Sequence, residues 1–155
     1  MVVVGRFDTQ TAQILTECGC DTPTEWYCGY IGVGPDHVLY GCSYDEDSEH
    51  LTPPEDGDSI GARGVLSLFC NALDDFKGHS PELCFDVHGS LTFSGSCDSM
   101  GPMDTVKGDF WWFGFDCHHG GDNPDDHDEI YVKQECERLA TQLAAVLTPK
   151  GERDE

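Results

Sequence analysis

The sequence predicts an α+β fold in which a mainly antiparallel sheet packs against a C-terminal amphipathic helix. Apolar residues recur at helical spacing over the stretch 129–147. Two earlier segments, 25–34 and 110–117, are rich in β-branched or aromatic residues, and a third, 82–95, alternates apolar and polar residues as a strand does. Together these observations predict a sheet with the helix across one of its faces.

The strand predictions rest on composition and alternation. The segment "EWYCGYIGVG" (25–34) ends in Gly-Val-Gly-Pro, which indicates a strand followed by a turn. In "ELCFDVHGSLTFSG" (82–95), a strand would place Leu83, Phe85 and Val87 on one face and Asp86 and His88 on the other. The run "FWWFGFDC" (110–117) predicts a third strand, and the polar residues after it predict a loop.

The helix is predicted by a stripe of apolar residues in steps of four, three, four and three: Val132, Cys136, Leu139, Leu143 and Val146. Asp128 precedes the stripe as an N-cap, and Glu129 stands in the first turn, where the helix dipole favours an acid. Pro149 and Gly151 end it.

The remaining segments are predicted less specifically. Either a helix or a strand fits 7–17 and 65–76, whereas 37–47 is a short apolar segment and 48–64 and 96–109 are loops. No internal repeat or domain boundary is visible, so we expect one domain over residues 1–155, with 148–155 as an acidic tail.

Charge is the dominant feature of the composition. Thirty acidic residues stand against eight basic ones, which gives a net charge of -22 and a pI near 4.2. Such a surface suits cytoplasm with molar salt, where the Debye length falls to about 3 Å. We therefore expect a halophilic, haloarchaeal host or one of its viruses. The alternative is an acidic protein that mimics DNA or binds cations.

The composition also excludes several classes of partner and location. So few basic residues cannot offset the acidic field against phosphates, so we do not expect nucleic acid as a partner. No apolar run approaches the roughly 20 residues of a membrane span, and no export signal is recognisable. Nine cysteines, an odd number, then fit reduced thiols in the cytoplasm of a host cell, most of them buried in the core.

Two segments share a design that points to a polar pocket. In each, an aromatic segment is followed by aspartate and histidine and then by a loop with glycine. The residues are Asp86 and His88 in the first segment, and Asp116, His118, His119 and Asp122 in the second. If the two strands are neighbours, these side chains converge at one end of the sheet. They would bind a small polar ligand or a divalent metal such as zinc or manganese, with His88, Asp116 and His118 as metal ligands, or act as acids and bases without metal.

A purely structural interpretation stands beside this one. An aspartate before a histidine also orients that histidine, and Asp122-Asn123-Pro124 is a good turn with no function. Most of the aromatic run should be core, with at most one ring, Trp112, left at the rim of the pocket to stack on a ligand. Cys117 and His118 do not suit a nucleophile–base pair, because adjacent strand residues point apart.

Four segments in order resemble a known family: "GYIGVGPDHVLYG", "FDVHGSLTFSG", "WWFGFDCHHGGD" and "YVKQECERLATQL". The family comprises small proteins of tailed phages, prophages and some prokaryotic genomes, with "VHGGLTFSG" and "WWFGFDCAHAGD" motifs and no assigned activity. The resemblance covers most of residues 28–144. Ser90 stands where the family usually has a second glycine, and the histidine of the second family motif corresponds to either His118 or His119.

The resemblance and the charge together imply a small cytoplasmic accessory protein of a haloarchaeal virus or provirus. The Asp/His pocket would bind a small polar ligand or a divalent metal, and hydrolysis by an activated water is the first reaction class to test. The competing hypothesis is a non-catalytic interaction protein, which would be a virion component or a counter-defence protein that binds a host factor or a signalling nucleotide. In that case the Asp/His set is structural.

The charge generates a testable prediction about salt. Because the net charge is -22, self-repulsion should lower the free energy of unfolding in dilute buffer, and molar salt should restore it by screening. Thermal unfolding followed by circular dichroism should therefore give a Tm that rises steadily from about 0.05 to 2 M KCl. A Tm that does not change over this range, in metal-free protein, would contradict the halophilic interpretation.

Overall fold

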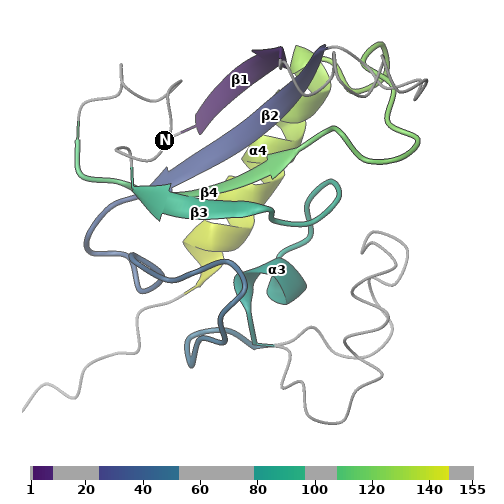
Figure 1. Ribbon diagram of the computed structural model, residues 1–155. Coiled ribbons are helices and arrows are strands. Elements are labelled where there is room, and N and C mark those ends of the chain that lie inside the picture. The colour runs from purple at the N-terminus through teal and green to yellow at the C-terminus, as the bar shows by residue number, and fades with distance from the viewer. Residues whose placement is uncertain (1, 9–24, 53–78, 97–107, 147–155) are drawn as a thin grey trace, which may run out of the picture.

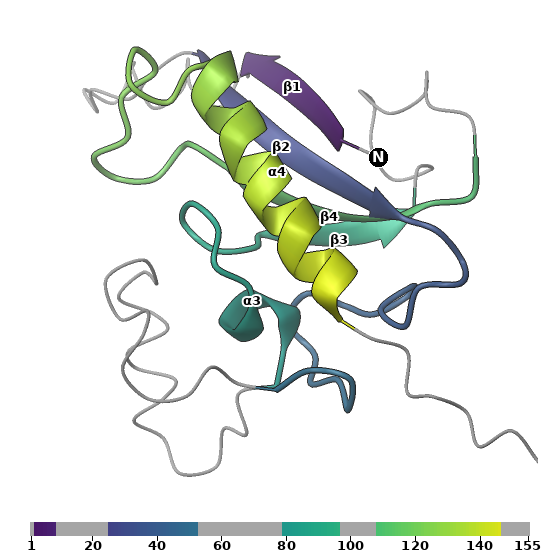
Figure 2. The same cartoon turned by 180° about the vertical axis from the view of Figure 1, so that it is seen from behind.

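The computed structural model describes residues 2–8, 25–52, 79–96 and 108–146 (Figure 1). Within them, strands β1 (Val2–Asp8), β2 (Glu25–Val33), β3 (Phe93–Ser96) and β4 (Trp111–Asp116) form one sheet in the order β1-β2-β4-β3. Each neighbouring pair is antiparallel. The long helix α4 (Glu129–Ala145) lies across one face of the sheet, as Figure 2 shows from behind. The predicted α+β fold class is confirmed.

Helix α4 forms and packs as its sequence pattern predicts. The Asp128 carboxylate caps its N-terminus by accepting a hydrogen bond from the backbone N–H of Tyr131 at 2.9 Å. The apolar stripe is fully buried at four positions: Val132, Cys136, Leu139 and Leu143. These side chains share one core with Ile31 of β2 and with Phe113 and Phe115 of β4. Burial of this stripe fixes the helix on the sheet.

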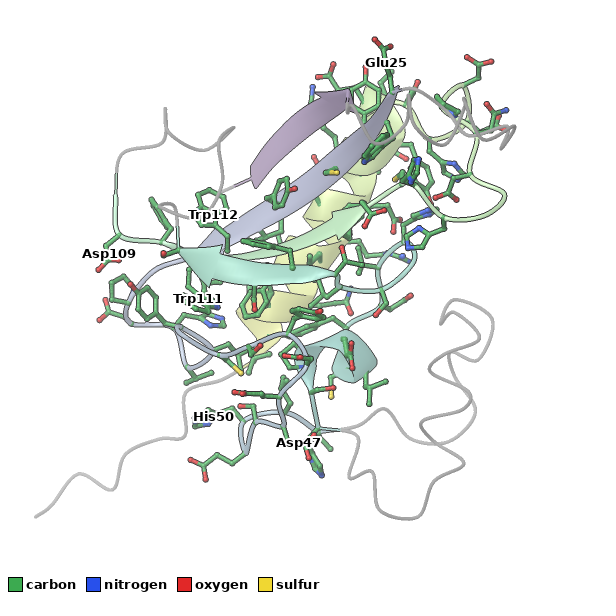
Figure 3. All side chains as sticks on the ribbon, viewed as in Figure 1. Glu25, Asp47, His50, Asp109, Trp111 and Trp112 are labelled. Atoms are coloured by element: carbon green, nitrogen blue, oxygen red, sulfur yellow. The ribbon has the colours of Figure 1, made fainter. Side chains whose placement is uncertain are left out.

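A second apolar cluster covers the opposite face of the sheet. It contains the buried side chains of Cys28, Tyr30 and Trp112, and three half-buried aromatic rings pack against it. Strand alternation explains the division, because Trp111, the neighbour of Trp112, packs on the α4 side (Figure 3). The indole N–H of Trp111 donates to the Cys42 carbonyl at 2.8 Å. The aromatic run is therefore core on both faces, as predicted for most of its members.

The strand predicted over 82–95 is largely wrong. Residues Pro81–Cys84 form a short helix, α3, residues 85–92 are irregular, and only Phe93–Ser96 pair as β3. Proline favours the start of a helix because its φ is already suitable and its missing N–H needs no partner there. The side chains nevertheless follow the predicted pattern of burial, because Leu83, Phe85 and Val87 are all buried.

Other segments fall partly or wholly outside the described residues. The segments 9–17, 53–64, 65–76, 97–107 and 148–155 belong to this group, so their predictions stay predictions. The apolar segment 37–47 consists of turns rather than a strand. Its His37 ring nitrogen Nε2 lies 3.0 Å from the Leu143 carbonyl near the end of α4. No helix in the described ranges has both the length and the apolar character needed to cross a bilayer.

The close approach of α4 to β2 generates a prediction about Gly29. A Cβ atom at this position would lie 2.5 Å from both the Cys136 sulfur and the Phe115 ring. Gly29→Ala should therefore lower the free energy of unfolding by about 1–3 kcal/mol through overpacking, despite the usual benefit of replacing glycine in a strand. Gly34→Ala is the matched control, because no atom of the described residues lies within 4 Å of its Cβ position. Urea unfolding of both variants measures the difference, and equal stabilities would contradict this packing.

Candidate functional site

The structure separates the residues that the sequence grouped into one pocket. His88, His119 and Asp122 come together beside the N-terminal half of α4. Asp116 and His118 line a different hollow, on the face of the sheet away from α4. The two remaining candidates lie elsewhere: Asp86 contacts Arg138 and Gln142 of α4, and Trp112 is only 1% exposed in the second apolar cluster. The predicted convergence fails because residues 85–92 are not a strand beside β4.

Asp122 is the centre of the first group. One carboxylate oxygen, Oδ2, lies 3.1 Å from His88 Nε2 and 3.1 Å from His119 Nδ1. The same oxygen accepts the backbone N–H of His119 at 2.7 Å. The other oxygen, Oδ1, lies 3.9 Å from His127 Nδ1. Three histidines therefore surround one carboxylate whose side chain is only 11% exposed.

Helix α4 fixes the orientation of His88. The ring nitrogen Nδ1 lies 2.9 Å from the Tyr131 hydroxyl, opposite the nitrogen that faces Asp122. The backbone N–H of His88 donates to Glu135 Oε2 at 2.8 Å, and Arg138 holds the same oxygen at 2.7 Å. Because a tyrosine hydroxyl can donate or accept, it suits either tautomer of the imidazole. The His88 ring is thus held on both of its nitrogens and through its backbone N–H.

The loop that carries His88 is held by side chains of α4 in place of a neighbouring strand. The Gln142 amide accepts the Asp86 N–H at 2.7 Å and donates to the Asp86 carbonyl at 2.7 Å. Arg138 donates to the Asp86 carboxylate at 3.1 Å. The predicted ligand Asp86 is therefore an anchor of the loop on the helix, and its contacts do not include Asp122.

A tight turn brings this loop against His119. Gly89 has a φ of 64°, and a Cβ atom there would collide with the His119 ring. Ser90 has a φ of 87°, a conformation that favours glycine. The Ser90 hydroxyl offsets part of this strain by donating to the Glu82 carbonyl at 2.9 Å.

The surroundings of Asp122 favour its charged form. Burial by itself raises the pKa of this carboxyl, but the hydrogen bonds from the His119 backbone and the His88 ring, with the charge of His88, outweigh it and lower the pKa. Nearby, burial first and the Glu135 carboxylate second raise the pKa of Tyr131, so its hydroxyl stays protonated. The centre is therefore an anionic carboxylate among imidazoles and a neutral phenol.

This geometry changes the predicted metal ligands. In the described part of the chain, His88, Asp122 and His127 each offer one ligand atom, and these atoms all lie within 4.8 Å of one another. The predicted set of His88, Asp116 and His118 does not form such a group, because Asp116 and His118 line the other hollow. Ligands around a tetrahedral ion at about 2.0–2.1 Å stand roughly 3.4 Å apart, so small side-chain movements would complete the site.

Cys117 lies inside the core, in surroundings that keep its thiol protonated. It is 3% exposed, and burial, with the carboxylate of Asp122 as the next cause, raises the pKa of its thiol to about 12. Only the thiolate is reactive, so its reactive fraction near neutral pH is very small. This agrees with the sequence argument against a pair of Cys117 with His118.

The comparisons with known proteins add nothing to this geometry. No family model, curated protein or solved structure matches the chain. The site must therefore be interpreted from its own side chains.

Sequence reasoning missed His127 and the polar side chains of α4 that support His88. A signal for the helix residues was present, because Tyr131, Glu135, Arg138 and Gln142 recur at steps of four, three and four beside the apolar stripe. His127 carried no such signal. It precedes the helix in a turn, where the backbone N–H of Asn123 donates to its Nδ1 at 3.2 Å.

The buried thiols generate a labelling prediction. Burial raises the pKa of Cys28, Cys117 and Cys136 to about 12, so at pH 8 only about one thiol in 10⁴ is ionised. Iodoacetamide should therefore modify these three far more slowly in folded protein than in urea, by at least about 10³-fold. Half-buried Cys84 is the internal comparison and should react faster. Peptide mass spectrometry resolves the sites, and rapid labelling of Cys117 in folded protein would restore it as a candidate nucleophile.

Proposed function

We propose that the protein binds a divalent metal ion, most suitably zinc, through His88, Asp122 and His127. The observation that carries the proposal is the grouping of two imidazoles and one carboxylate within 4.8 Å. Two nitrogen ligands and one oxygen ligand suit zinc in sites that keep a coordination position open. Manganese prefers oxygen-rich ligands, so the second imidazole favours zinc between the two metals.

The partners of these three residues suit the proposal. Metal-binding histidines usually donate their second ring N–H to an oxygen that fixes the tautomer. The Tyr131 hydroxyl, 2.9 Å from His88 Nδ1, is placed to accept this proton while Nε2 faces Asp122. Ring contacts between His88 and His127, with centroids 4.6 Å apart, keep the two imidazoles together.

His119 gives the proposed centre a possible chemical use. Its side chain is 37% exposed, more than any other member of the group, and its Nδ1 lies 3.1 Å from Asp122. A zinc ion bound here would supply Lewis acidity and a water with a lowered pKa. His119 would then accept or return a proton at the solvent side. Hydrolysis of a small polar substrate is the reaction class that fits these groups.

The proposed setting is a cytoplasmic accessory protein of a haloarchaeal virus or provirus. It is supported by the net charge of -22 and by the motifs described from the sequence. A non-catalytic interaction protein remains the second hypothesis, because Asp122 Oδ2 already accepts three contacts from His88 and His119. A saturated carboxylate of this kind is also what a purely structural network would contain.

Zinc titration distinguishes the two hypotheses. Protein purified in high salt and stripped with a chelator should take up zinc in isothermal titration calorimetry. His88→Ala and His127→Ala should each weaken this uptake by at least about tenfold, the loss that even an outer-shell partner causes. Elemental analysis of the dialysed samples checks the stoichiometry.

Two variants serve as controls. His118→Ala and His50→Ala should leave zinc affinity unchanged, since neither ring belongs to the proposed centre. The sequence predicted His118 as a metal ligand, whereas the structure groups His88 with Asp122 and His127. A loss of zinc affinity in His118→Ala would therefore favour the ligand set predicted from the sequence. If both His88→Ala and His127→Ala bind zinc as tightly as the unmodified protein, or if the unmodified protein binds no zinc, the proposal is wrong and the cluster is a structural network.

A further inference from the structure

The hollow on the sheet face away from α4 is a second, independent candidate site. Its volume is about 380 Å³, which lies within the range of small-molecule pockets. Strand β2 contributes three of its described lining residues, Trp26, Cys28 and Tyr30. Thr92 and Phe93 come from the start of β3 and the residue before it, Phe115 and Asp116 from the end of β4, and His118 from the loop after β4. None of these residues belongs to the proposed zinc centre.

Two pairs of aromatic rings bound this hollow along β2. Trp26 lies against the His118 imidazole, with ring centroids 4.1 Å apart. Tyr30 lies against Phe93 in an edge arrangement, with centroids 5.9 Å apart. Trp26 and Tyr30 are four residues apart on one strand, which corresponds to about 13 Å at 3.3 Å per residue. The two ring pairs therefore stand at separate positions along the strand, and both belong to the lining of the hollow.

Small or short side chains form the floor between these rings. Cys28 pairs with Asp116 across β2 and β4, and both lie between the two aromatic pairs. Tyr30 pairs with Gly114, and a Cβ there would lie 2.5 Å from the tyrosine ring. The missing side chain of Gly114 therefore leaves room for the Tyr30 ring across the two strands.

The Asp116 carboxylate is held in a fixed position at this floor. Its Oδ2 accepts the Thr92 hydroxyl at 3.0 Å, and its Oδ1 accepts the His118 backbone N–H at 3.1 Å. Each carboxylate oxygen has a second lone pair for a ligand. His118 Nε2 is buried and has no hydrogen-bond partner among the described residues, an unusual state for a polar atom in a folded protein.

The charges around the hollow select for a cation. Among the lining residues that the structure describes there is no lysine or arginine, and Asp116 is the carboxylate. Burial raises the pKa of both Cys28 and Tyr30, so the thiol and the phenol stay neutral. The net charge of -22 extends this preference to the whole protein and disfavours anionic ligands. Aromatic faces beside a carboxylate are the surroundings that bind alkylammonium ions.

We propose that this hollow binds a small free alkylammonium ion of about the size of choline, between the Trp26–His118 and Tyr30–Phe93 ring pairs and beside Asp116. The cationic head would contact the aromatic faces, and the carboxylate would neutralise its charge. This proposal does not depend on metal binding at His88, Asp122 and His127.

A pair of probes with the same shape tests the charge preference directly. Choline and 3,3-dimethylbutan-1-ol differ in the replacement of the charged nitrogen by carbon. In full-length protein at about 1 M NaCl, where non-specific attraction is screened, choline should bind at least about tenfold more tightly. Calorimetry measures the affinities, and the indole N–H resonance of Trp26 in NMR spectra reports the location. Equal affinities, or no binding of choline, would overturn the proposal.

A matched pair of variants tests the role of Asp116. Asp116→Asn keeps the shape of the side chain and should reduce choline affinity at least about tenfold. Asp109→Asn removes the same charge from an exposed carboxylate that contacts Tyr40, outside the hollow, and should leave the affinity unchanged. An equal loss in both variants would show that choline responds only to net charge, which would also overturn the site.

Discussion

The paired hydrogen bonds between the Gln142 side chain and the backbone of Asp86 determine where His88 can lie. A strand would satisfy this backbone with another strand, but here one helical side chain satisfies both polar groups of one residue. Glu135, about two helical turns earlier, continues the arrangement by accepting the His88 N–H. Side chains of the helix thus make the hydrogen bonds to this irregular loop that a neighbouring strand would otherwise make. Without this arrangement the His88 ring would have no fixed relation to Asp122.

Helix α4 has two structural roles, and each is carried by one of two adjacent stripes of side chains. Its apolar stripe buries four side chains against the sheet, and its polar stripe holds the loop that brings His88 to the candidate centre. The close approach at Gly29 sets the distance between helix and sheet. Since both stripes belong to one rigid element, the position of the centre follows from the packing of the core.

At the end of β4, successive residues lie on opposite faces of the sheet, so the two candidate sites form on different sides of the strand. Strand alternation directs Asp116 to the hollow, whereas Cys117 belongs to the core under α4 and the chain then turns toward Asp122. The carboxylates of both Asp122 and Asp116 add to the effect of burial on the pKa of Cys117. The two candidate sites are therefore close enough for their charges to act on one buried thiol, although no described lining residue of the hollow belongs to the group of His88, Asp122 and His127.

The sequence by itself determined the elements whose signal is local. Period and capping gave α4 and Asp128, and aromatic composition gave β2 and β4. It also identified Leu83, Phe85 and Val87 as one buried set, but not their conformation, because an irregular segment can bury alternate side chains as a strand does. Only the tertiary structure decided that Asp122 lies with His88 and His127 while Asp116 and His118 face the other side. The physical reason is that these contacts depend on which element satisfies the backbone of residues 85–92, and that partner is a helix 47 to 56 residues away in the chain.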